Sequence, residues 1–512
     1  MQSPILGSAY VARSVNAADN RMVNLFPEVV PEGGQMPAFL NRAPGLRFQQ
    51  TVGTGPIRGL WPRPGGSGGF YVVSGNGVYL LTSLAAAPTL LGNIPNGITP
   101  VSITDNGDQI VFVTNPDAFV YTQSTGVFTQ ITDPDFPGAV TVGYLDGYFV
   151  FNEPNSQRLW VTSLFDATQI DALDFASAEG DPDGVVGIIV DHREVWVFGT
   201  NSTEVWYNAG TPDFPLARIQ GAYNEIGCVA PFSVAKMDNS VFWLGRDARG
   251  QGIVYRAGGY VGQRISTHAI EWQIQQYSDM SDAVAYTYQQ DGHAFYVLNF
   301  PTGGTTWVYD AATGAWHERA YFDMGEFSRH RGNCQCNVNG DTIIGDYQNS
   351  NIYTFDLDAY SDNGTPQKWL RSWRALPTGA NNLRRTAQHS LQLNCETGVG
   401  LNGIPPGNTP ADPPFTLDLD FTAQQYLFPG SIPTVQGADP QVMLRWSDDG
   451  GHTWSNEHWV SIGKIGQYGR RAIWRRLGMT LKLRDRVYEV SGTDPVKLVI
   501  IGAELVLSGT NA

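Results

Sequence analysis

A short two-strand pattern recurs between Gly59 and Asp356. Each copy is an alternating apolar strand, a turn of Gly, Asn or Asp, and a second strand rich in aromatic residues. The copies are SITDNGDQIVFVT (102–114), VGYLDGYFVFN (142–152), IIVDHREVWVFG (188–199), VAKMDNSVFWLG (234–245), YTYQQDGHAFYVLN (286–299) and CNVNGDTIIGD (336–346). They begin mostly about 40 to 50 residues apart, which is the period of the blades of a β-propeller. A propeller is a disc with a central channel, and by itself it specifies no chemistry.

Seven segments are expected to form the inner strands of the blades. They are Ile57–Trp61, Val101–Thr104, Val140–Leu145, Val185–Val190, Pro231–Lys236, Val284–Tyr288 and Asn333–Val338. Segments with a repeated Tyr or Trp, from VYLL (78–81) to NIYTF (351–355), are expected to form the outer strands of the blades. Their aromatic side chains are expected to pack each blade against the next. Seven starts predict seven blades, and six remain possible if the first or last is degenerate. One helix is expected within 266–279, capped by Ser266 or Thr267.

The chain is expected to divide into three regions of an all-β protein. Residues 1–48 are rich in proline and form a strap that docks on another domain, and residues 49–364 form the β-propeller of six or seven blades. Residues 365–512 contain long alternating strands, which predict an additional antiparallel β platform domain with an exposed loop at 399–415.

The net charge of −16 is unevenly distributed. Residues 1–364 hold 17 Lys/Arg against 36 Asp/Glu, a net charge of −19, whereas residues 365–512 hold 15 against 12, a net charge of +3. The acidic region is a poor general DNA binder, because affinity for phosphates depends on Lys and Arg. It would suit a surface past which DNA slides without sticking.

No signal peptide and no apolar run long enough to span a bilayer is visible, so a soluble protein made in the cytoplasm is expected.

The residues 447–454, SDDGGHTW, match the S-x-D-x-G-x-T-W pattern of the Asp-box, which is found in sialidases and related propellers. Ser447, Asp449, Gly451, Thr453 and Trp454 are its defining positions. Such a pattern predicts a hairpin turn in which the Asp carboxylate accepts backbone amides, the Gly adopts a positive φ and the Trp anchors the turn. In sialidases these turns lie away from the active site, so a structural role is expected here.

No catalytic, cofactor-binding or metal-binding residues are assigned, and the chain is expected not to be an enzyme. A glycosidase needs two carboxylates held across a sugar, and the abundant acidic residues mostly lie in Pro/Gly turns, where Asp commonly forms the turn. These residues are Asp133, Asp135, Asp181, Asp183 and Asp213. Cys334 and Cys336 form a C-x-C pair without two further ligands, so core or surface thiols are favoured over a metal site.

A basic cluster near the C-terminus is the candidate interface. Its members are Arg470, Arg471, Arg475, Arg476, Lys482, Arg484 and Arg486. One interpretation is an electrostatic contact with an acidic partner or with DNA phosphates, with a protein partner favoured over DNA. The other is a solvated strand face whose counter-charges are Asp485 and Glu489. The sequence leaves the two interpretations about equal.

Several stretches together resemble the tail hub, or tail nozzle, proteins of short-tailed bacteriophages, the packaged-DNA-stabilisation family. They are NRMVNLFPE (20–28), LNRAPGL (40–46), YNEIGCVAPFSVAKMDNSVFWLGRD (223–247), GGYVGQRISTHAIE (258–271), SDDGGHTW (447–454) and RRAIWRRLG (470–478). The match is in consistent order and spans nearly the whole chain. No catalytic residues come with this family.

The resemblance implies a structural protein of the virion tail that assembles as a hexameric ring below the portal and its adaptor. The ring would extend the channel for double-stranded DNA, retain the packaged genome, and carry tail fibres, tailspikes or a tail needle. Residues 365–512 and the strap would then form the ring-making platform.

The competing interpretation is a carbohydrate- or receptor-binding propeller of the sialidase or tailspike kind. A third interpretation, a general cellular interaction propeller, lacks support because no WD or kelch signature is present.

Overall fold

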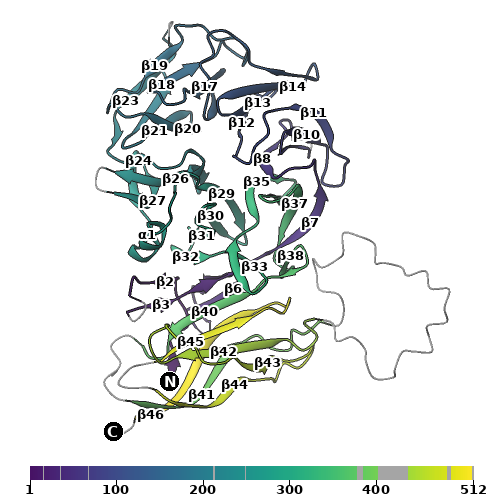
Figure 1. The fold of residues 1–512 in the computed structure, drawn as a ribbon, viewed down its shortest axis with the longest axis vertical. Coiled ribbons are helices and arrows are strands. Elements are labelled where there is room, and N and C mark those ends of the chain that lie inside the picture. The colour runs from purple at the N-terminus through teal and green to yellow at the C-terminus, as the bar shows by residue number, and fades with distance from the viewer. Residues whose placement is uncertain are drawn as a thin grey trace, which may run out of the picture. The chain divides into compact units, whose positions relative to one another are not determined.

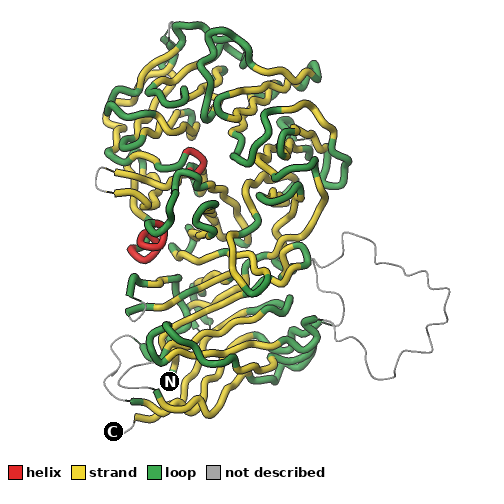
Figure 2. Tube along the Cα trace, viewed as in Figure 1, coloured by secondary structure: helices red, strands yellow, loops and turns green. Residues whose placement is uncertain are grey.

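The computed structural model describes the chain except for a set of short segments and one longer one. The residues left out are 15–16, 35, 67, 212–213, 248–249, 378–384, 402–435, 481–485 and 510–512. The described residues are mostly β-strands, with one α-helix, α1 (His268–Ile274), and one 3-10 helix, η1 (Pro231–Ser233) (Figure 2). The loop expected at 399–415 lies outside the described residues from position 402 onward.

The chain divides into two compact units, each held together by its own internal contacts. Unit 1 consists of Met1–Phe48, Ala315–Ser328 and Phe355–Ala512, and unit 2 consists of Gln49–Gly314 and Arg329–Thr354. The predicted division instead placed 49–364 in a single propeller region. It differs because two short segments, 315–328 and 355–364, make their contacts in unit 1.

Unit 2 contains seven antiparallel sheets, the blades of a propeller (Figure 1). Blade 1 is β8 (Ile57–Pro62), β9 (Phe70–Ser74), β10 (Gly77–Leu81) and β11 (Thr89–Asn93); blade 2 is β12 (Ser102–Asp105), β13 (Gln109–Thr114), β14 (Asp117–Thr122) and β15 (Val127–Gln130). Blade 3 is β16 (Val142–Leu145), β17 (Tyr148–Asn152), β18 (Arg158–Val161) and β19 (Phe175–Ser177); blade 4 is β20 (Val185–Asp191), β21 (Glu194–Gly199), β22 (Thr203–Asn208) and β23 (Leu216–Asn224).

The remaining three blades are less regular. Blade 5 is β24 (Gly227–Cys228), β25 (Ala235–Met237), β26 (Ser240–Asp247), β27 (Gly250–Gly258) and β28 (Val261–Arg264). Blade 6 contains β29 (Val284–Gln290), β30 (His293–Phe300) and β31 (Thr305–Asp310), and blade 7 contains β35 (Gly332–Val338), β36 (Asp341–Asp346) and β37 (Asn351–Asp356). Helix α1 follows blade 5, and the Thr267 hydroxyl accepts a hydrogen bond from the Ile270 amide, as the capping prediction requires.

The innermost strands form a closed ring. Each of β8, β12, β16, β20, β29 and β35 contacts its neighbours, and the segment η1–β25 completes the circle in blade 5. All seven expected inner-strand segments fall at these positions, so the prediction of a propeller is confirmed and the seven-blade alternative is the one observed. The alternating apolar pattern located strands such as β29, whose residues alternate between buried and partly exposed positions, because alternation is typical of a strand with one buried face.

Hydrophobic clusters fill the spaces between neighbouring blades. Tyr71 and Val73 of blade 1 pack with Phe112 and Tyr121 of blade 2, and the Tyr71 ring lies edge-on to both aromatic rings. Equivalent clusters join blades 2 and 3, blades 3 and 4, and blades 4 and 5. The repeated aromatic residues of the sequence therefore hold the blades against each other.

Residues 49–52, which precede the first blade, close the ring of blades. The Val52 amide donates to the Ser350 carbonyl at 2.7 Å, the Thr51 hydroxyl donates to Asn351 Oδ1 at 2.8 Å, and Gln49 Nε2 donates to Thr354 Oγ1 at 2.8 Å. Val52 also packs in the apolar cluster shared by blades 7 and 1. Backbone near the start of unit 2 is thus joined to its last strand.

The segments expected as outer strands are the third strands of their blades. VYLL (78–81) lies in β10 and FVYT (119–122) in β14, and a fourth strand, β11 or β15, lies beyond each. These fourth strands carry exposed side chains such as Leu90 and Val127, which are 52% and 54% exposed. Their sequence lacks the apolar alternation of a half-buried strand, and this is why the pattern did not reveal them.

Unit 1 is built from two antiparallel sheets that form a β-sandwich. One sheet has the order β44 (Ala472–Met479), β41 (Thr386–Cys395), β46 (Val499–Gly509), β6 (Ala38–Arg42) and β5 (Leu25–Val29), with β1 (Gln2–Ser3) also pairing with β46. The other has the order β4 (Met22–Val23), β40 (Trp369–Arg374), β45 (Val487–Gly492), β42 (Gln441–Ser447) and β43 (His458–Ser461). Tyr488 of the second sheet donates a hydrogen bond to Gln388 of the first at 3.2 Å.

Small hairpins and short strands complete unit 1 and its borders. They are β2 (Tyr10–Val11) with β3 (Asp19–Asn20), β33 (Ala320–Asp323) with β34 (Glu326–Arg329), β38 (Ser361–Asp362) with β39 (Thr365–Pro366), the strand β32 (Ala315–Glu318) beside β4, and β7 (Gly45–Thr51), which runs into unit 2. Asn24 bonds both the amide and the carbonyl of Ala320, and Arg21 pairs with Glu318 at 2.9 Å. These contacts explain why 315–328 belongs with the N-terminal residues.

Candidate functional site

The first strands of the seven blades surround a cavity of about 460 Å³ at the centre of unit 2. Its charged lining residues are Arg58, Asp105 and Lys236. The Arg58 guanidinium is buried and donates to the carbonyls of Gly75 and Pro95 at 2.8 Å, so it holds loops rather than facing a ligand. The Asp105 carboxylate accepts the indole N–H of Trp61 at 2.7 Å, and Lys236 Nζ donates to a backbone carbonyl at 3.0 Å. The three charged side chains thus bond separate internal partners and do not pair with one another as an acid and a base.

Two of the acidic turn residues accept hydrogen bonds from backbone amides. Asp183 Oδ2 accepts the amides of Asn201 and Ser202 at 2.6 and 3.0 Å, and Asp133 Oδ1 accepts the amide of Asp135 at 2.9 Å. Asp213 lies outside the described residues. Asp133 thus folds its own turn, which fits its interpretation as a turn former, whereas the Asp183 carboxylate holds the separate turn between β21 and β22.

Cys334 and Cys336 lie on β35, on the inner side of blade 7. Cys336 is buried in the apolar cluster between blades 7 and 1, and Cys334 packs against that cluster. Burial raises the pKa of the Cys334 thiol to about 12, so this thiol is protonated at neutral pH. Both side chains therefore act as small apolar residues of the core.

The Asp-box residues form a hairpin turn after β42. Asp449 Oδ1 accepts the Ser447 hydroxyl at 2.6 Å and the amides of His452 and Thr453 at 2.9 Å, while Oδ2 accepts the Thr453 hydroxyl at 2.5 Å. Gly451 has a φ of +102° and lies against Asp19, where a Cβ atom would come within 2.5 Å of the carboxylate. The ring of Trp454 lies under the Arg445 guanidinium at 4.7 Å. The turn thus has the geometry of a structural element.

Asp449→Asn is expected to lower the free energy of unfolding of unit 1 by about 1 kcal/mol at pH 7. The hydroxyl of Ser447, followed by the Thr453 donors, holds the pKa of Asp449 well below its usual range. A lowered folded-state pKa stabilises the fold above the unfolded pKa of about 3.9, and this contribution is lost as the pH falls through the folded-state pKa. Denaturant titrations at pH 7 and pH 3 should show the difference between variant and wild type shrinking in acid. An equal difference at both pH values would contradict the assignment.

The predicted arginine cluster is divided by the structure. Arg470, Arg471, Arg475 and Arg476 are exposed on β44 and on the loop that precedes it. Within the described parts of the chain, none of these four guanidinium groups has a carboxylate within salt-bridge distance. Lys482, Arg484 and Asp485 lie outside the described residues, and the proposed counter-charge Glu489 pairs with Arg445.

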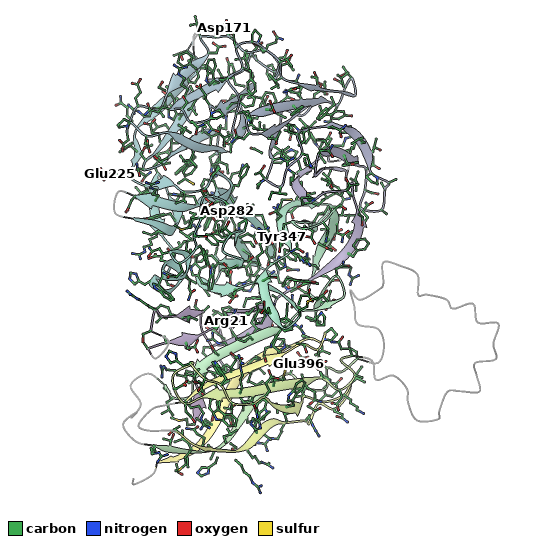
Figure 3. All side chains as sticks on the ribbon, in the orientation of Figure 1. Arg21, Asp171, Glu225, Asp282, Tyr347 and Glu396 are labelled. Carbon is green, nitrogen blue, oxygen red and sulfur yellow. The ribbon has the colours of Figure 1, made fainter. Side chains whose placement is uncertain are left out.

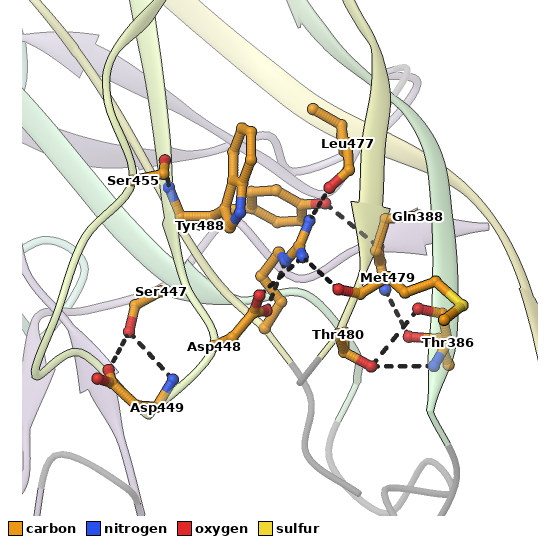
Figure 4. Close-up of polar contacts among 12 residues, drawn as sticks. Thr386, Gln388, Ser447, Asp448, Asp449, Ser455, Leu477, Met479, Thr480 and Tyr488 are labelled. Carbon is orange, nitrogen blue, oxygen red and sulfur yellow. Dashed lines mark hydrogen bonds and ion pairs between the residues drawn. The ribbon is translucent and has the colours of Figure 1, made fainter. Parts of the chain in front are cut away.

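Arg486 differs from the prediction because its side chain is buried inside unit 1. Its guanidinium binds both carboxylate oxygens of Asp448 at 2.7 and 2.9 Å and donates to the carbonyls of Leu477 and Met479 (Figure 4). It also lies over the ring of Trp446 at 5.0 Å. Arg486 is therefore a structural residue of the sandwich and is unavailable to a partner.

Exposed apolar side chains near the four arginines were missed by the sequence analysis. Trp459 on β43 is 60% exposed, and Ile465 and Tyr468, in the loop between β43 and β44, are 52% and 76% exposed. Exposed aromatic residues beside arginine are typical of protein interfaces. The available signal was the short distance in sequence between these residues and Arg470.

Two family models match the chain. Residues 1–360 match the family described as bacteriophage P22 Gp10, β-propeller, and residues 423–508 match the family described as bacteriophage P22 Gp10, β-sandwich. The first match alone covers well over half of the chain. The chain belongs to the bacteriophage P22 Gp10 family. The resemblance to phage tail hub proteins inferred from the sequence is thereby confirmed, and this member of the Gp10 family is a structural protein of a phage tail.

Solved structures similar to this Gp10-family chain include domains of Nup159 and Doa1. The N-terminal domain of Nup159 is 11% identical with a TM-score of 0.39, and the match covers 64% of this chain and 98% of that one. The WD40 β-propeller domain of Doa1 is 12% identical with a TM-score of 0.40, covering 61% of this chain and 97% of that one. A search of curated proteins finds no match. No helix in the described part of the chain is long and apolar enough to cross a membrane.

The charge of this Gp10-family member follows its two units. Unit 2 holds 12 Lys/Arg against 27 Asp/Glu, a net charge of −15, and unit 1 holds 20 against 21, a net charge of −1. The acidic excess thus lies in the propeller, whereas the four arginines without a carboxylate partner among the described residues lie in the sandwich. A basic partner suits the propeller, and an acidic partner suits these arginines.

Proposed function

We propose that the chain is the tail hub, or nozzle, subunit of a short-tailed phage. Copies of it would form a hexameric ring below the portal and its adaptor, extend the DNA channel and retain the packaged genome. Membership of the Gp10 family carries this proposal. The turn carboxylates and the central cavity, whose polar groups are engaged in internal contacts, are consistent with a structural role rather than an enzymatic one.

The acidic propeller supports a non-adhesive path for DNA. A net charge of −15 on unit 2 repels phosphates, so DNA beside it would pass without sequence-specific binding and without being held by counterion release. The sandwich and the N-terminal strands would form the platform that makes the ring. Tail fibres, tailspikes or a needle would attach to the assembled ring, in the virion tail, after synthesis of the chain in the host cytoplasm.

Particles assembled without this chain test the proposal. Their DNA content should be measured directly after packaging and again after incubation, by nuclease protection of the encapsidated genome. Capsids that fill and then lose their DNA are expected, because the channel would lack its extension. Particles that stay full of DNA and only fail to bind cells would contradict genome retention and would favour a receptor-binding propeller instead.

A further inference from the structure

The four exposed arginines lie at an unpaired border of the sandwich. Strand β44 is the last strand of its sheet, with β41 as its only neighbour in the order of the described strands. Arg475 and Arg476 lie on β44, and Arg470 and Arg471 directly precede it. We call these four residues the arginine edge. Four positive charges that have no carboxylate partner in the described part of the chain are suited to an acidic partner.

A β-bulge turns two consecutive arginines of this edge toward solvent. Arg475 pairs with Ser390, but Gln388, two residues earlier on β41, pairs with Gly478, so β44 carries an extra residue between these pairs. Arg476 has a φ of +60°, which is uncommon for a residue with a side chain. Successive residues of a regular strand point to opposite faces, yet Arg475 and Arg476 are both exposed. Bulges commonly re-aim side chains in this way.

Exposed apolar side chains extend the arginine edge. Strand β43 lies beside β44, because the Trp474 indole donates to the carbonyl of His458 at 2.8 Å. Trp459 lies on β43, and Ile465 and Tyr468 lie in the loop between β43 and β44. Each of the three residues is more than half exposed. Aromatic residues and arginine together are the residue types that contribute most binding energy at protein interfaces. Their combination favours a protein partner over DNA phosphates, which would need charge alone.

The blade-3 loop of unit 2, residues 163–174 between β18 and β19, carries complementary features. Leu164, Phe165 and Leu173 are 54%, 66% and 76% exposed. Asp171 is exposed at the outer edge of blade 3 (Figure 3) and has no cation within salt-bridge distance among the described residues. Phe165 has a φ of +61°, and its amide donates to the Gly147 carbonyl, which holds the bulky residue in this unusual conformation.

We propose that the arginine edge of one copy docks on the blade-3 loop of a second copy. The arginines meet Asp171 in the most acidic unit of the chain, and Trp459 and Tyr468 meet the exposed leucines and phenylalanine. The two surfaces differ, so the contact is heterologous, and repetition of a heterologous contact closes a ring when the rotation allows it. The proposal deepens the proposed function and rests on its ring assembly.

Two charge-reversed chains test the contact. One carries Arg475→Glu with Arg476→Glu, and the other carries Asp171→Lys. Both leave buried contacts intact, although Asp171→Lys removes the exposed hydrogen bond from the Leu173 amide to the Asp171 carboxylate. Sedimentation velocity of the purified full-length proteins should show wild-type association that weakens with added salt, and at least about tenfold weaker association for each variant alone. Mixing the two variants should restore association, because the Glu edge then faces a Lys loop and the wild-type edge faces a wild-type loop. Thermal unfolding of each variant should match the wild type.

A matched control is Arg13→Glu, which reverses an exposed arginine of unit 1 outside the arginine edge. It should associate like the wild type. A wild-type chain that stays monomeric at low salt, variants that associate normally, or a mixture that is not restored would each overturn the proposal. Loss of association in the edge variant alone would indicate that the arginine edge docks on a different acidic surface of the second copy and would also overturn the proposal. These results concern purified protein, so they are independent of the DNA content of particles.

Discussion

Replacing Arg42 with methionine is expected to lower the free energy of unfolding of unit 1 by about 3 to 5 kcal/mol. The buried guanidinium donates to the carbonyls of Asp494, Val496 and Tyr360 at 2.6, 2.9 and 3.2 Å, and it also bonds Gln367. Methionine fills similar volume but leaves these carbonyls buried without donors. Burial lowers the pKa of Arg42 to about 10, so the side chain is still charged at neutral pH.

Arg47→Met is the matched control for Arg42. The Arg47 side chain is 46% exposed and pairs with Asp356, so its loss should cost less than about 1 kcal/mol. Denaturant titration followed by tryptophan fluorescence measures both variants, analysed for separate transitions because the chain has two units. Limited proteolysis should cut the N-terminal residues sooner in Arg42→Met. Equal small effects of the two changes would show that the bonds of Arg42 contribute little.

Replacing Arg486 with leucine is expected to lower the free energy of unfolding of unit 1 by about 3 to 5 kcal/mol. Asp448 would keep a partly buried carboxylate with no cation, and the carbonyls of Leu477 and Met479 would lose their donor. Since Leu477 lies on β44 and Arg486 directly precedes β45, this side chain ties the two sheets of the sandwich together. Calorimetry or denaturant titration measures the loss.

Two further variants show whether the charge pair causes this loss. Arg486→Leu with Asp448→Leu should recover part of the stability, because it removes the unpaired carboxylate as well. Arg475→Leu on the arginine edge should change the unfolding free energy by less than about 0.5 kcal/mol, since its side chain is exposed and unpaired. If Arg486→Leu were as stable as Arg475→Leu, the buried role of Arg486 would be wrong.

The contrast between Arg475 and Arg486 shows where sequence reasoning stops. Both lie in similar runs of alternating basic and apolar residues, and neither composition nor spacing separates a buried guanidinium from an exposed one. The difference comes from Asp448, whose carboxylate reaches Arg486 across 38 positions of the chain. Such pairing depends on the register of β42 and β45, which a single sequence does not specify.

The propeller was predictable because each blade repeats a local pattern. Inner strands such as Val142–Leu145 carry apolar alternation and end at an Asp or Gly turn, and the structure places a strand there. The sandwich was predictable only as a class, because its strand order joins distant segments. Strand β46 pairs with β6 and β1, and no local signal links Ile500 to Leu40 or Glu504 to Gln2. The arginine edge was found in sequence, but its aromatic neighbours were not.

The pairing of β1 with β46 has a consequence for how the subunit is made. Gln2 and Ser3 are synthesised long before their strand partners, Glu504 and Ala503. At about 5 to 20 residues per second, roughly half a minute to two minutes of synthesis separates these partners. The Val52 amide is likewise synthesised long before the Ser350 carbonyl to which it donates a hydrogen bond. A chain that stops before β46 therefore lacks the partner strand of β1, β6 and β41, so this sheet of the sandwich is completed only after β46 has been made.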